Sequence, residues 1–205
     1  MDKSRHILQA GLEQLELQAT QSQLDLLLAF VSLIEKWNKA YNLTAIRNRE
    51  EMLRLHILDS LAILPLVTGK KIIDVGTGAG LPGIPLAILL PDVQFTLVDS
   101  NSKKTRFVQQ ATLELQLKNV TVVHGRIENL GHEGEYDAVL SRAFASLEDI
   151  MNMTEYLLQP EGVLIAMKGQ QPEIELKKID RAYSITPIVV PGVDAERCVV
   201  RINKT

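Results

Sequence analysis

The first third of the chain has its hydrophobic residues spaced as in amphipathic helices. Over the range Ser22–Tyr41 they recur every three or four positions, which predicts one helix with an apolar face. Ser22 followed by Asp25 resembles a capping box that would start this helix. A second helical pattern covers Arg49–Leu64 and should end at Pro65. We therefore expect a helical N-terminal extension over residues 1–65.

Beyond that extension, short apolar runs alternate with helical patterns. Strand-like runs lie at Lys71–Val75, Phe95–Asp99, Val120–Val123, Tyr136–Leu140 and Val163–Met167. Helical patterns lie at Gly83–Leu90, Lys103–Leu117 and Leu147–Leu158. This alternation predicts an α/β domain over residues 66–205, packed with the extension as one unit around a mostly parallel sheet. Two last runs, Ile185–Val190 and Cys198–Ile202, predict an antiparallel hairpin at the edge of a seven-stranded sheet.

A glycine-rich stretch follows the first predicted strand. Gly76, Gly78 and Gly80 occupy alternate positions, and such glycines let the backbone turn sharply beside a ligand. Asp99 comes nineteen residues after Gly80, at the end of the second predicted strand. A carboxylate there can accept both ribose hydroxyls of an adenosine. The loop and the acid together predict an adenosine-containing cofactor, and a glycine turn without a ligand is the alternative.

The residues around the glycines distinguish between cofactors. Residues 78–83 fit the dinucleotide pattern G-x-G-x-x-G, which keeps a nicotinamide or flavin enzyme open. However, Pro82 and Pro85 fall where the helix of that motif would begin, and Asp74 precedes the glycines. A carboxylate repels a pyrophosphate but attracts the ammonium group of S-adenosylmethionine. The local chemistry therefore favours S-adenosylmethionine as the cofactor, and methyl transfer as the reaction.

Five motifs extend this interpretation to most of the chain. They are KWNKAYNLT at 36–44, HILDS at 56–60, DVGTGAGLPGIP at 74–85, SRAFA at 141–145 and KG at 168–169. In this combination the chain resembles the glucose-inhibited division protein B family, which is the ribosomal RNA small subunit methyltransferase G family. The resemblance implies a class I Rossmann-like methyltransferase fold. It also implies an enzyme that methylates N7 of a guanine in 16S ribosomal RNA of the small subunit.

The resemblance also assigns cofactor contacts to matching positions. Those contacts are Gly76, Leu81, Ile127, Glu128 and Arg142. We add Thr77 and Gly78 from the same loop, and Asp99 from its spacing and its place after a strand.

The same motifs supply a catalytic set. Its members are Asn42, His56, Asp59, Arg142 and Lys168. Guanine N7 carries no proton, so no general base is needed, and the enzyme has to position the reacting atoms. We expect Arg142 or Lys168 to bind guanine O6 or a phosphate and leave N7 free. His56 and Asp59 share one helix face as a pH-sensitive or a structural pair, and Asn42 has helix capping as its alternative role.

The segment Lys36–Asp59 is the expected RNA side of the molecule. It carries five cations, namely Lys36, Lys39, Arg47, Arg49 and Arg54. Trp37 and Tyr41 lie among these cations and could stack on bases, although their own chemistry favours packing in the core.

Composition limits the remaining possibilities. The 205 residues are 46% hydrophobic and carry a net charge of -3, which predicts a folded chain and argues against general coating of nucleic acid. Neither a signal-peptide pattern nor a membrane-spanning run is evident, and Cys198 is the single cysteine. The four histidines are scattered, so no metal site is predicted. We expect a cytoplasmic monomer, with a non-catalytic RNA-binding assembly factor as the alternative to an enzyme.

Overall fold

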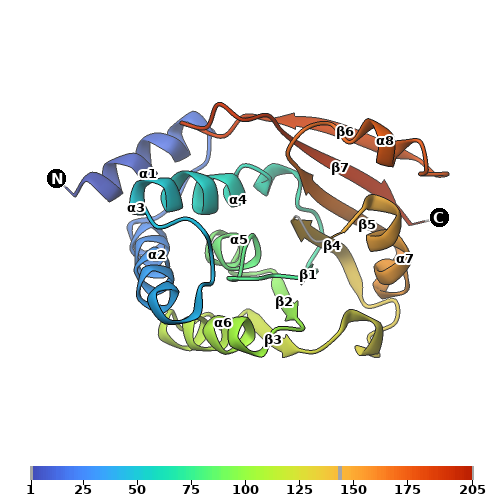
Figure 1. Cartoon of the computed structure of the whole chain (residues 1–205), viewed down its shortest axis with the longest axis horizontal. Coiled ribbons are helices and arrows are strands. Elements are labelled where there is room, and N and C mark those ends of the chain that lie inside the picture. The colour runs from blue at the N-terminus through green and yellow to red at the C-terminus, as the bar shows by residue number, and fades with distance from the viewer. Residues whose placement is uncertain (1, 143–144, 205) are drawn as a thin grey trace.

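The N-terminal part of the chain is helical. The computed structural model describes residues 2–142 and 145–204 and places α1 at Lys3–Gln14 and α2 at Gln21–Tyr41 (Figure 1). A capping box starts α2, but the prediction for its residues is wrong. The pair is Thr20 and Gln23, because Thr20 has the extended backbone of an N-cap and its hydroxyl accepts from the Gln23 N–H at 3.2 Å.

The second helical segment is broken into three consecutive parts. Helix α3 covers Arg49–Met52, a π-helical turn, η1, covers Leu53–Leu58, and α4 covers Asp59–Leu61. The predicted end at Pro65 is therefore too late. Pro65 instead lies in the 3-10 turn Leu64–Leu66, whose first positions need no backbone N–H from proline. No feature of the sequence distinguishes the π-helical turn from an ordinary helix.

Seven strands form one sheet in the order β3-β2-β1-β4-β5-β7-β6. Their bounds are β1 Lys71–Val75, β2 Gln94–Asp99, β3 Val120–His124, β4 Tyr136–Arg142, β5 Leu158–Lys168, β6 Tyr183–Ile188 and β7 Arg197–Asn203. Strands β1 to β5 are parallel, and β7 runs antiparallel to both β5 and β6. The predicted antiparallel hairpin is thus confirmed. Of the two hairpin strands, only β6 lies at an edge of the sheet, because β7 lies between β5 and β6.

Helices cover both faces of this sheet (Figure 1). They are α5 Gly83–Leu89, α6 Ser102–Glu114, α7 Leu147–Thr154 and α8 Glu173–Leu176. Alternate strand residues point to opposite faces. Ile72 accordingly packs in a core with α2, α5 and α6, whereas Ile73 packs in a second core with α7. Phe30 of α2 stacks on Phe107 of α6 at 6.2 Å between ring centroids, so the N-terminal extension shares the larger core. The boundary at residue 65 stays a prediction.

The carboxyl ends of the parallel strands meet along one edge of the sheet. Asp99, Arg142 and Lys168 are the last residues of β2, β4 and β5. Such an edge is where open α/β sheets bind ligands. None of the helices in the two described ranges is long and apolar enough to cross a membrane.

Candidate active site

A cavity of about 520 Å³ opens at the carboxyl ends of β1, β2 and β3. Four predicted cofactor residues line it, and they are Gly76, Asp99, Ile127 and Glu128. They follow or end three different strands, since Gly76 comes after β1, Asp99 ends β2, and Ile127 and Glu128 lie in a 3-10 turn after β3. The cavity therefore brings together residues that the sequence places at three separate points.

The glycine loop is shaped by backbone conformation and held by Asp99. Gly76 and Gly78 have φ of 67° and 60°, a region that residues with a Cβ rarely adopt. The Asp99 carboxylate accepts from the Gly78 N–H at 2.9 Å and from the Asn101 N–H at 2.8 Å. Each carboxylate oxygen keeps a further lone pair for a ligand. Asp99 thus fixes the loop at the same place where it faces the cavity.

Asp74 lies fully buried behind the loop. Its Oδ2 accepts from the Thr77 hydroxyl at 2.7 Å and from the Gly83 N–H at 3.0 Å. Its Oδ1 has no hydrogen-bond partner among residues 2–142 and 145–204. Burial raises the pKa of Asp74 to about 6, although these two hydrogen bonds and the charge of Arg142 favour the ionised form. Asp74 does not line the cavity, so its unpaired oxygen is a buried acceptor behind the loop.

Four predicted cofactor residues do not line this cavity, namely Thr77, Gly78 and Leu81 of the loop, and Arg142. Thr77 and Leu81 are buried, with 1% and 3% of their surfaces exposed. The Thr77 hydroxyl donates a hydrogen bond to Asp74, and the Gly78 N–H donates one to Asp99. These residues support the loop, and direct cofactor contacts from them stay a prediction. Arg142, the remaining member of the predicted set, lines a second cavity.

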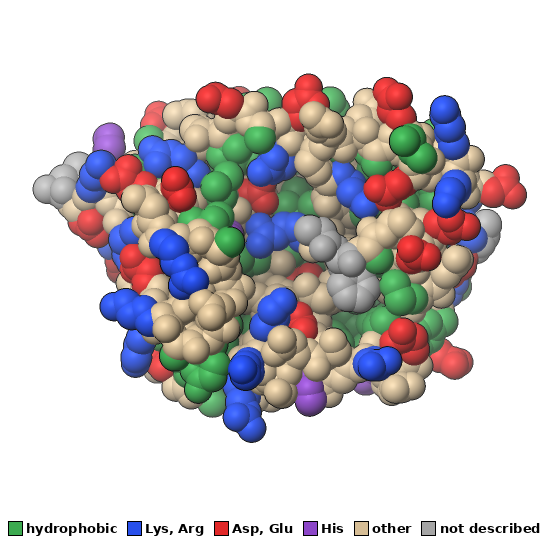
Figure 2. Space-filling model, in the orientation of Figure 1, with side chains coloured by type: hydrophobic (Ala, Val, Ile, Leu, Met, Phe, Trp, Pro, Cys, Tyr) green, Lys and Arg blue, Asp and Glu red, His purple; other side chains and the backbone are tan. Residues whose placement is uncertain are grey.

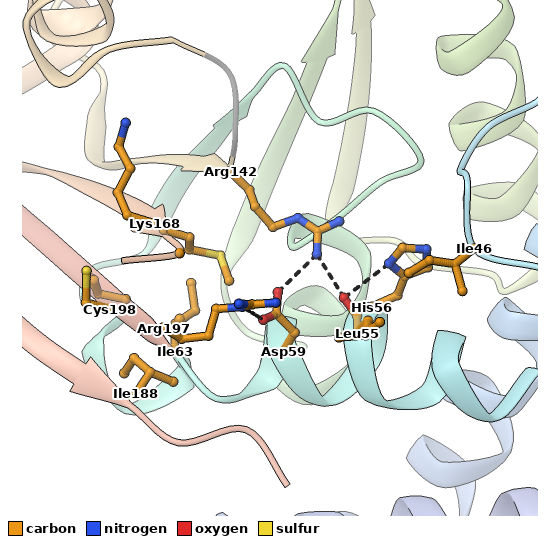
Figure 3. A pocket seen from close by; sticks show the side chains of 13 residues that line it. Ile46, Leu55, His56, Asp59, Ile63, Arg142, Lys168, Ile188, Arg197 and Cys198 are labelled. Atoms are coloured by element: carbon orange, nitrogen blue, oxygen red, sulfur yellow. Dashed lines mark hydrogen bonds and ion pairs between the residues drawn. The ribbon is translucent and has the colours of Figure 1, made fainter. Parts of the chain in front are cut away.

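The second cavity, of about 440 Å³, brings together most of the predicted catalytic set (Figure 3). His56, Asp59, Arg142 and Lys168 all line it. His56 comes from the π-helical turn, Asp59 from the start of α4, and the two cations from the ends of β4 and β5. Four residues scattered over the sequence therefore face one space.

A buried carboxylate lies between two guanidinium groups in this cavity. Asp59 Oδ2 accepts from Arg142 Nη1 at 3.2 Å, and Asp59 Oδ1 accepts from Arg197 Nε at 2.9 Å (Figure 3). Arg142 also donates to the Leu55 carbonyl at 3.3 Å. Arg197 begins β7 and was not among the predicted site residues. It lies 138 residues from Asp59, and no motif connects the two.

His56 is held in its neutral form. Its Nε2 lies 2.9 Å from Thr44 Oγ1, and its Nδ1 lies 3.2 Å from the Leu55 carbonyl. Burial, helped by the nearby charge of Arg142, lowers the pKa of His56 to about 4. Thr44 is itself positioned by Asn38, whose Oδ1 accepts from the Thr44 N–H at 3.0 Å. Neither Thr44 nor Asn38 was among the predicted site residues.

Lys168 points away from Asp59 and Arg142 (Figure 3). Its ammonium group pairs with Glu175 Oε2 at 2.8 Å and donates to the Ala145 carbonyl at 3.1 Å. Burial opposes ionisation of Glu175, but hydrogen bonds from Lys168 and the Leu147 N–H outweigh it and lower the pKa of Glu175. Lys168 therefore has a fixed carboxylate partner, which the sequence analysis did not anticipate.

Asn42 is the one predicted catalytic residue that the structure does not bring to a cavity. It is exposed and ends α2 in the left-handed region, with φ of 49°. Its Oδ1 accepts from Arg47 Nη2 at 2.8 Å. This geometry fits the capping role, and a catalytic role stays a prediction. In the SRAFA motif, Ala143 and Phe144 lie outside the described residues.

The two aromatic residues of the expected RNA side differ in burial. Trp37 is half-buried, and its ring lies 5.7 Å from that of Phe107 and 5.1 Å from that of Tyr41. Tyr41 remains 42% exposed. Trp37 therefore packs against the core, whereas the ring of Tyr41 stays accessible to solvent.

Two of the five cations on the expected RNA side are occupied by acidic partners. Arg49 pairs with Glu35, and Arg54 pairs with Glu50 at 3.7 Å. Lys36 and Lys39 are exposed, and within the part of the chain that the structure describes they form no ion pair. Figure 2, which has the orientation of Figure 1, shows Lys and Arg side chains around the hollow in the middle of the molecule.

Comparisons with known proteins agree on one family. A family model described as rRNA small subunit methyltransferase G matches residues 23–198. Proteins named ribosomal RNA small subunit methyltransferase G are similar at 49% identity in Legionella pneumophila strain Philadelphia 1 (99% of this chain, 96% of that protein) and at 50% in Marinomonas sp. strain MWYL1 (96% of each).

Solved structures give the same fold at low identity. A SAM-dependent methyltransferase from Aquifex aeolicus is 18% identical with a TM-score of 0.58, covering 76% of this chain and 93% of that one. A putative O-methyltransferase from Klebsiella pneumoniae is 14% identical with a TM-score of 0.59, covering 86% and 90%. The fold is therefore that of S-adenosylmethionine-dependent methyltransferases, as predicted. The matching model and the relatives at about half identity show that this chain belongs to the rRNA small subunit methyltransferase G family.

Proposed function

We propose that this protein transfers the methyl group of S-adenosylmethionine to N7 of a guanine in 16S ribosomal RNA of the small subunit. The observation that carries the proposal is the position of Arg142, which lines the second cavity and lies close enough to the glycine loop for its charge to act on Asp74. The Arg142 guanidinium binds Asp59 in that cavity. One cavity would hold the cofactor and the other the guanine, so that the reacting atoms meet near Arg142.

The residues of the first cavity fit S-adenosylmethionine. The cofactor supplies an activated methyl group on a sulfonium. Asp99 would accept the ribose hydroxyls, and Glu128 with the Ile127 N–H would hold the adenine edge. The unpaired Oδ1 of Asp74 offers a negative site for the methionine ammonium. A pyrophosphate would meet these same carboxylates unfavourably, which argues against the nicotinamide alternative.

The residues of the second cavity fit a guanine that reacts at N7. Both ring nitrogens of His56 already have partners, and the ring stays neutral. No proton leaves N7, so a free base is not required. Arg142 or Lys168 would bind guanine O6 or a phosphate and leave N7 open for in-line attack. In folded RNA the base must be unstacked to enter such a cavity.

The remaining expectations are part of this proposal. The protein would act as a monomer in the cytoplasm, where small ribosomal subunits occur. The exposed Lys36, Lys39 and Tyr41 would contact RNA around the target guanine. Since these contacts are few, the assembled subunit rather than free RNA is the expected substrate.

The test is methyl transfer from tritiated S-adenosylmethionine to small subunits that lack the modification, followed by mapping of the labelled nucleotide. We expect label at N7 of one guanine, and more label on subunits than on free 16S RNA. Tight RNA binding without transfer would instead support the assembly factor. Label on another atom or on large-subunit RNA would overturn the proposal.

A further inference from the structure

The ion pairs in the second cavity leave one positive charge without a partner. Asp59 is a single carboxylate with 6% of its side chain exposed, and it binds both Arg142 and Arg197. Lys168 is balanced by Glu175, and His56 is neutral at physiological pH. Among the described residues that line the cavity, the two arginines and Asp59 therefore carry a net charge of about +1.

The two arginines differ in what they can reach. Arg197 uses Nε for Asp59 and donates Nη1 to the Glu196 carbonyl at 2.9 Å. Arg142 gives one nitrogen, Nη1, to Asp59 and the Leu55 carbonyl. Its other donors are not used in any described hydrogen bond, and its charge is felt by Asp74. Arg142 is thus the cation that lines the second cavity and whose charge also acts on Asp74 behind the glycine loop, and Arg197 is the one committed to local partners.

We propose that Arg197 is a positioning residue that acts through Asp59 and keeps Arg142 available to its ligands. The inference rests on the proposed function, since those ligands would be the target nucleotide and the cofactor. A buried carboxylate binds a guanidinium most strongly as a bidentate pair. Without Arg197, Asp59 would have only Arg142 to neutralise it, and would draw that guanidinium into a closed pair.

The geometry supports this division of roles. Asp59 begins α4 directly after the π-helical turn, and Arg197 begins β7, which is paired on both sides in the sheet. The 2.9 Å bond between Arg197 and Asp59 joins these two elements and holds the carboxylate. Arg142 ends β4, and its longer 3.2 Å bond leaves it the looser of the two partners.

A series of charge variants tests the inference. Arg197→Gln removes the neutralising charge, and Asp59→Asn in the same chain removes the need for it. The net charge of the group is then about 0 in R197Q, about +1 in the double variant and about +2 in D59N, against about +1 in the wild type. The measurements are kcat/KM for unmodified small subunits, the dissociation constant of S-adenosylmethionine without RNA, and the melting temperature.

We expect R197Q to lose about tenfold to a hundredfold in kcat/KM, as a displaced positioning group does. Its affinity for S-adenosylmethionine should fall as well. The double variant should recover most of both losses, and Arg197→Lys, which keeps the charge, should retain most of the activity. If R197Q does not fold, R197K and the double variant still decide the matter. Failure of the double variant to exceed R197Q, or full activity in R197Q, would overturn the inference.

The same experiment separates the inference from the function on which it rests. A wild-type protein that methylates no ribosomal RNA would refute the proposed function. The cofactor affinities of the wild type, R197Q, R197K and the double variant would then still follow, or fail to follow, the expected order, with R197Q weakest. Methylation by the wild type with no such order would refute only the role of Arg197.

Discussion

The two cavities of this protein are built in different ways. The first is lined by residues between positions 75 and 128, and its shape depends on backbone turns fixed by Asp99. The second is lined by residues from position 46 to position 199, and its shape depends on side chains. Its central contacts, between Asp59 and the two arginines, join residues that are 83 and 138 positions apart.

This difference has a physical consequence. Backbone hydrogen bonds in a short loop depend on local conformation and survive most changes elsewhere. Ion pairs between buried side chains depend on every element that carries a partner, and loss of one partner leaves a buried charge. We therefore expect the first cavity to respond mainly in cofactor affinity, and the second mainly in turnover and in pH-dependent stability.

The largest expected effect is in the first cavity. Asp99→Ala removes a carboxylate that holds the Gly78 N–H and would also accept the ribose hydroxyls. Two hydrogen bonds to a charged group contribute about 3 kcal/mol, so affinity for S-adenosylmethionine should fall by about a hundredfold. Isothermal titration calorimetry measures the change. Glu114→Ala, at an exposed acid on α6, is the control, and an unchanged dissociation constant in D99A would refute the assignment.

The second prediction uses opposite pH responses of the two regions. The pKa of His56 is lowered to about 4 in the folded protein. As pH falls, the unfolded chain therefore protonates this histidine at a higher pH than the folded chain does. Stability from neutral His56 is present above pH 6.5 and is lost as pH falls toward 4. Asp74 has its pKa raised to about 6, and its contribution is instead lost as pH rises from about 4 to about 6.

His56→Gln isolates the response of the second region. The wild type should lose about 2 kcal/mol of unfolding free energy between pH 8 and pH 5 relative to this variant, since only the wild type has the titrating ring. Urea unfolding at the two pH values gives the comparison. A difference between the proteins that does not change with pH would contradict a buried neutral His56.

The third prediction concerns turnover. Lys168→Ala should lower kcat by about tenfold, the low end of what a contact to a base edge contributes. Cofactor affinity should stay nearly unchanged, because Lys168 lines only the second cavity. Single-turnover methyl transfer and calorimetry separate the two quantities. Lys178→Ala removes a 64% exposed lysine that pairs with Glu148 and serves as the control.

Glu175→Gln refines this third test, because it releases Lys168 from its ion pair. If Lys168 contacts the substrate, this variant should keep its turnover. A loss equal to that of K168A would show that the pair itself is what matters, and equal loss of cofactor binding in K168A would exclude the substrate role.

The smallest expected effect lies outside both cavities. Asn42 has φ of 49° and binds Arg47, so Asn42→Gly should keep the turn and change turnover by less than about twofold. Initial rates on small subunits measure this. A loss comparable to that of K168A would place Asn42 in substrate binding and restore the catalytic role that the sequence resemblance implies.

The sequence predicts the sheet well and part of the lining of the first cavity. Buried strands such as Lys71–Val75 appear as short apolar runs, and their expected bounds lie close to the observed ones. Gly76 and Asp99 were found because a local turn and a strand end leave a pattern in the sequence. The N-cap of α2, Thr20, was missed because Thr20 and Ser22 are both suitable N-cap residues.

The second cavity could be predicted only in part. Motifs identify His56, Asp59, Arg142 and Lys168 as a group, but they do not identify the partners of these residues. In the sequence, Arg197 and Glu175 look like ordinary charged residues, one directly before a predicted strand and one in a polar segment. Their importance comes from three-dimensional contacts across the sheet edge, and a single sequence carries no periodicity or spacing that records such contacts.

The lining of the second cavity depends on the number of residues in the π-helical turn at Leu53–Leu58. A π turn contains one residue more than an α-helix would use over the same rise. Deleting one residue here would let the segment continue as an ordinary helix with its two ends nearly in place, but side chains within the turn would change the direction in which they point. His56, which lies in the turn, would then point in a new direction relative to the rest of the cavity. We therefore expect related chains to tolerate substitutions in this turn far more readily than a change in its number of residues.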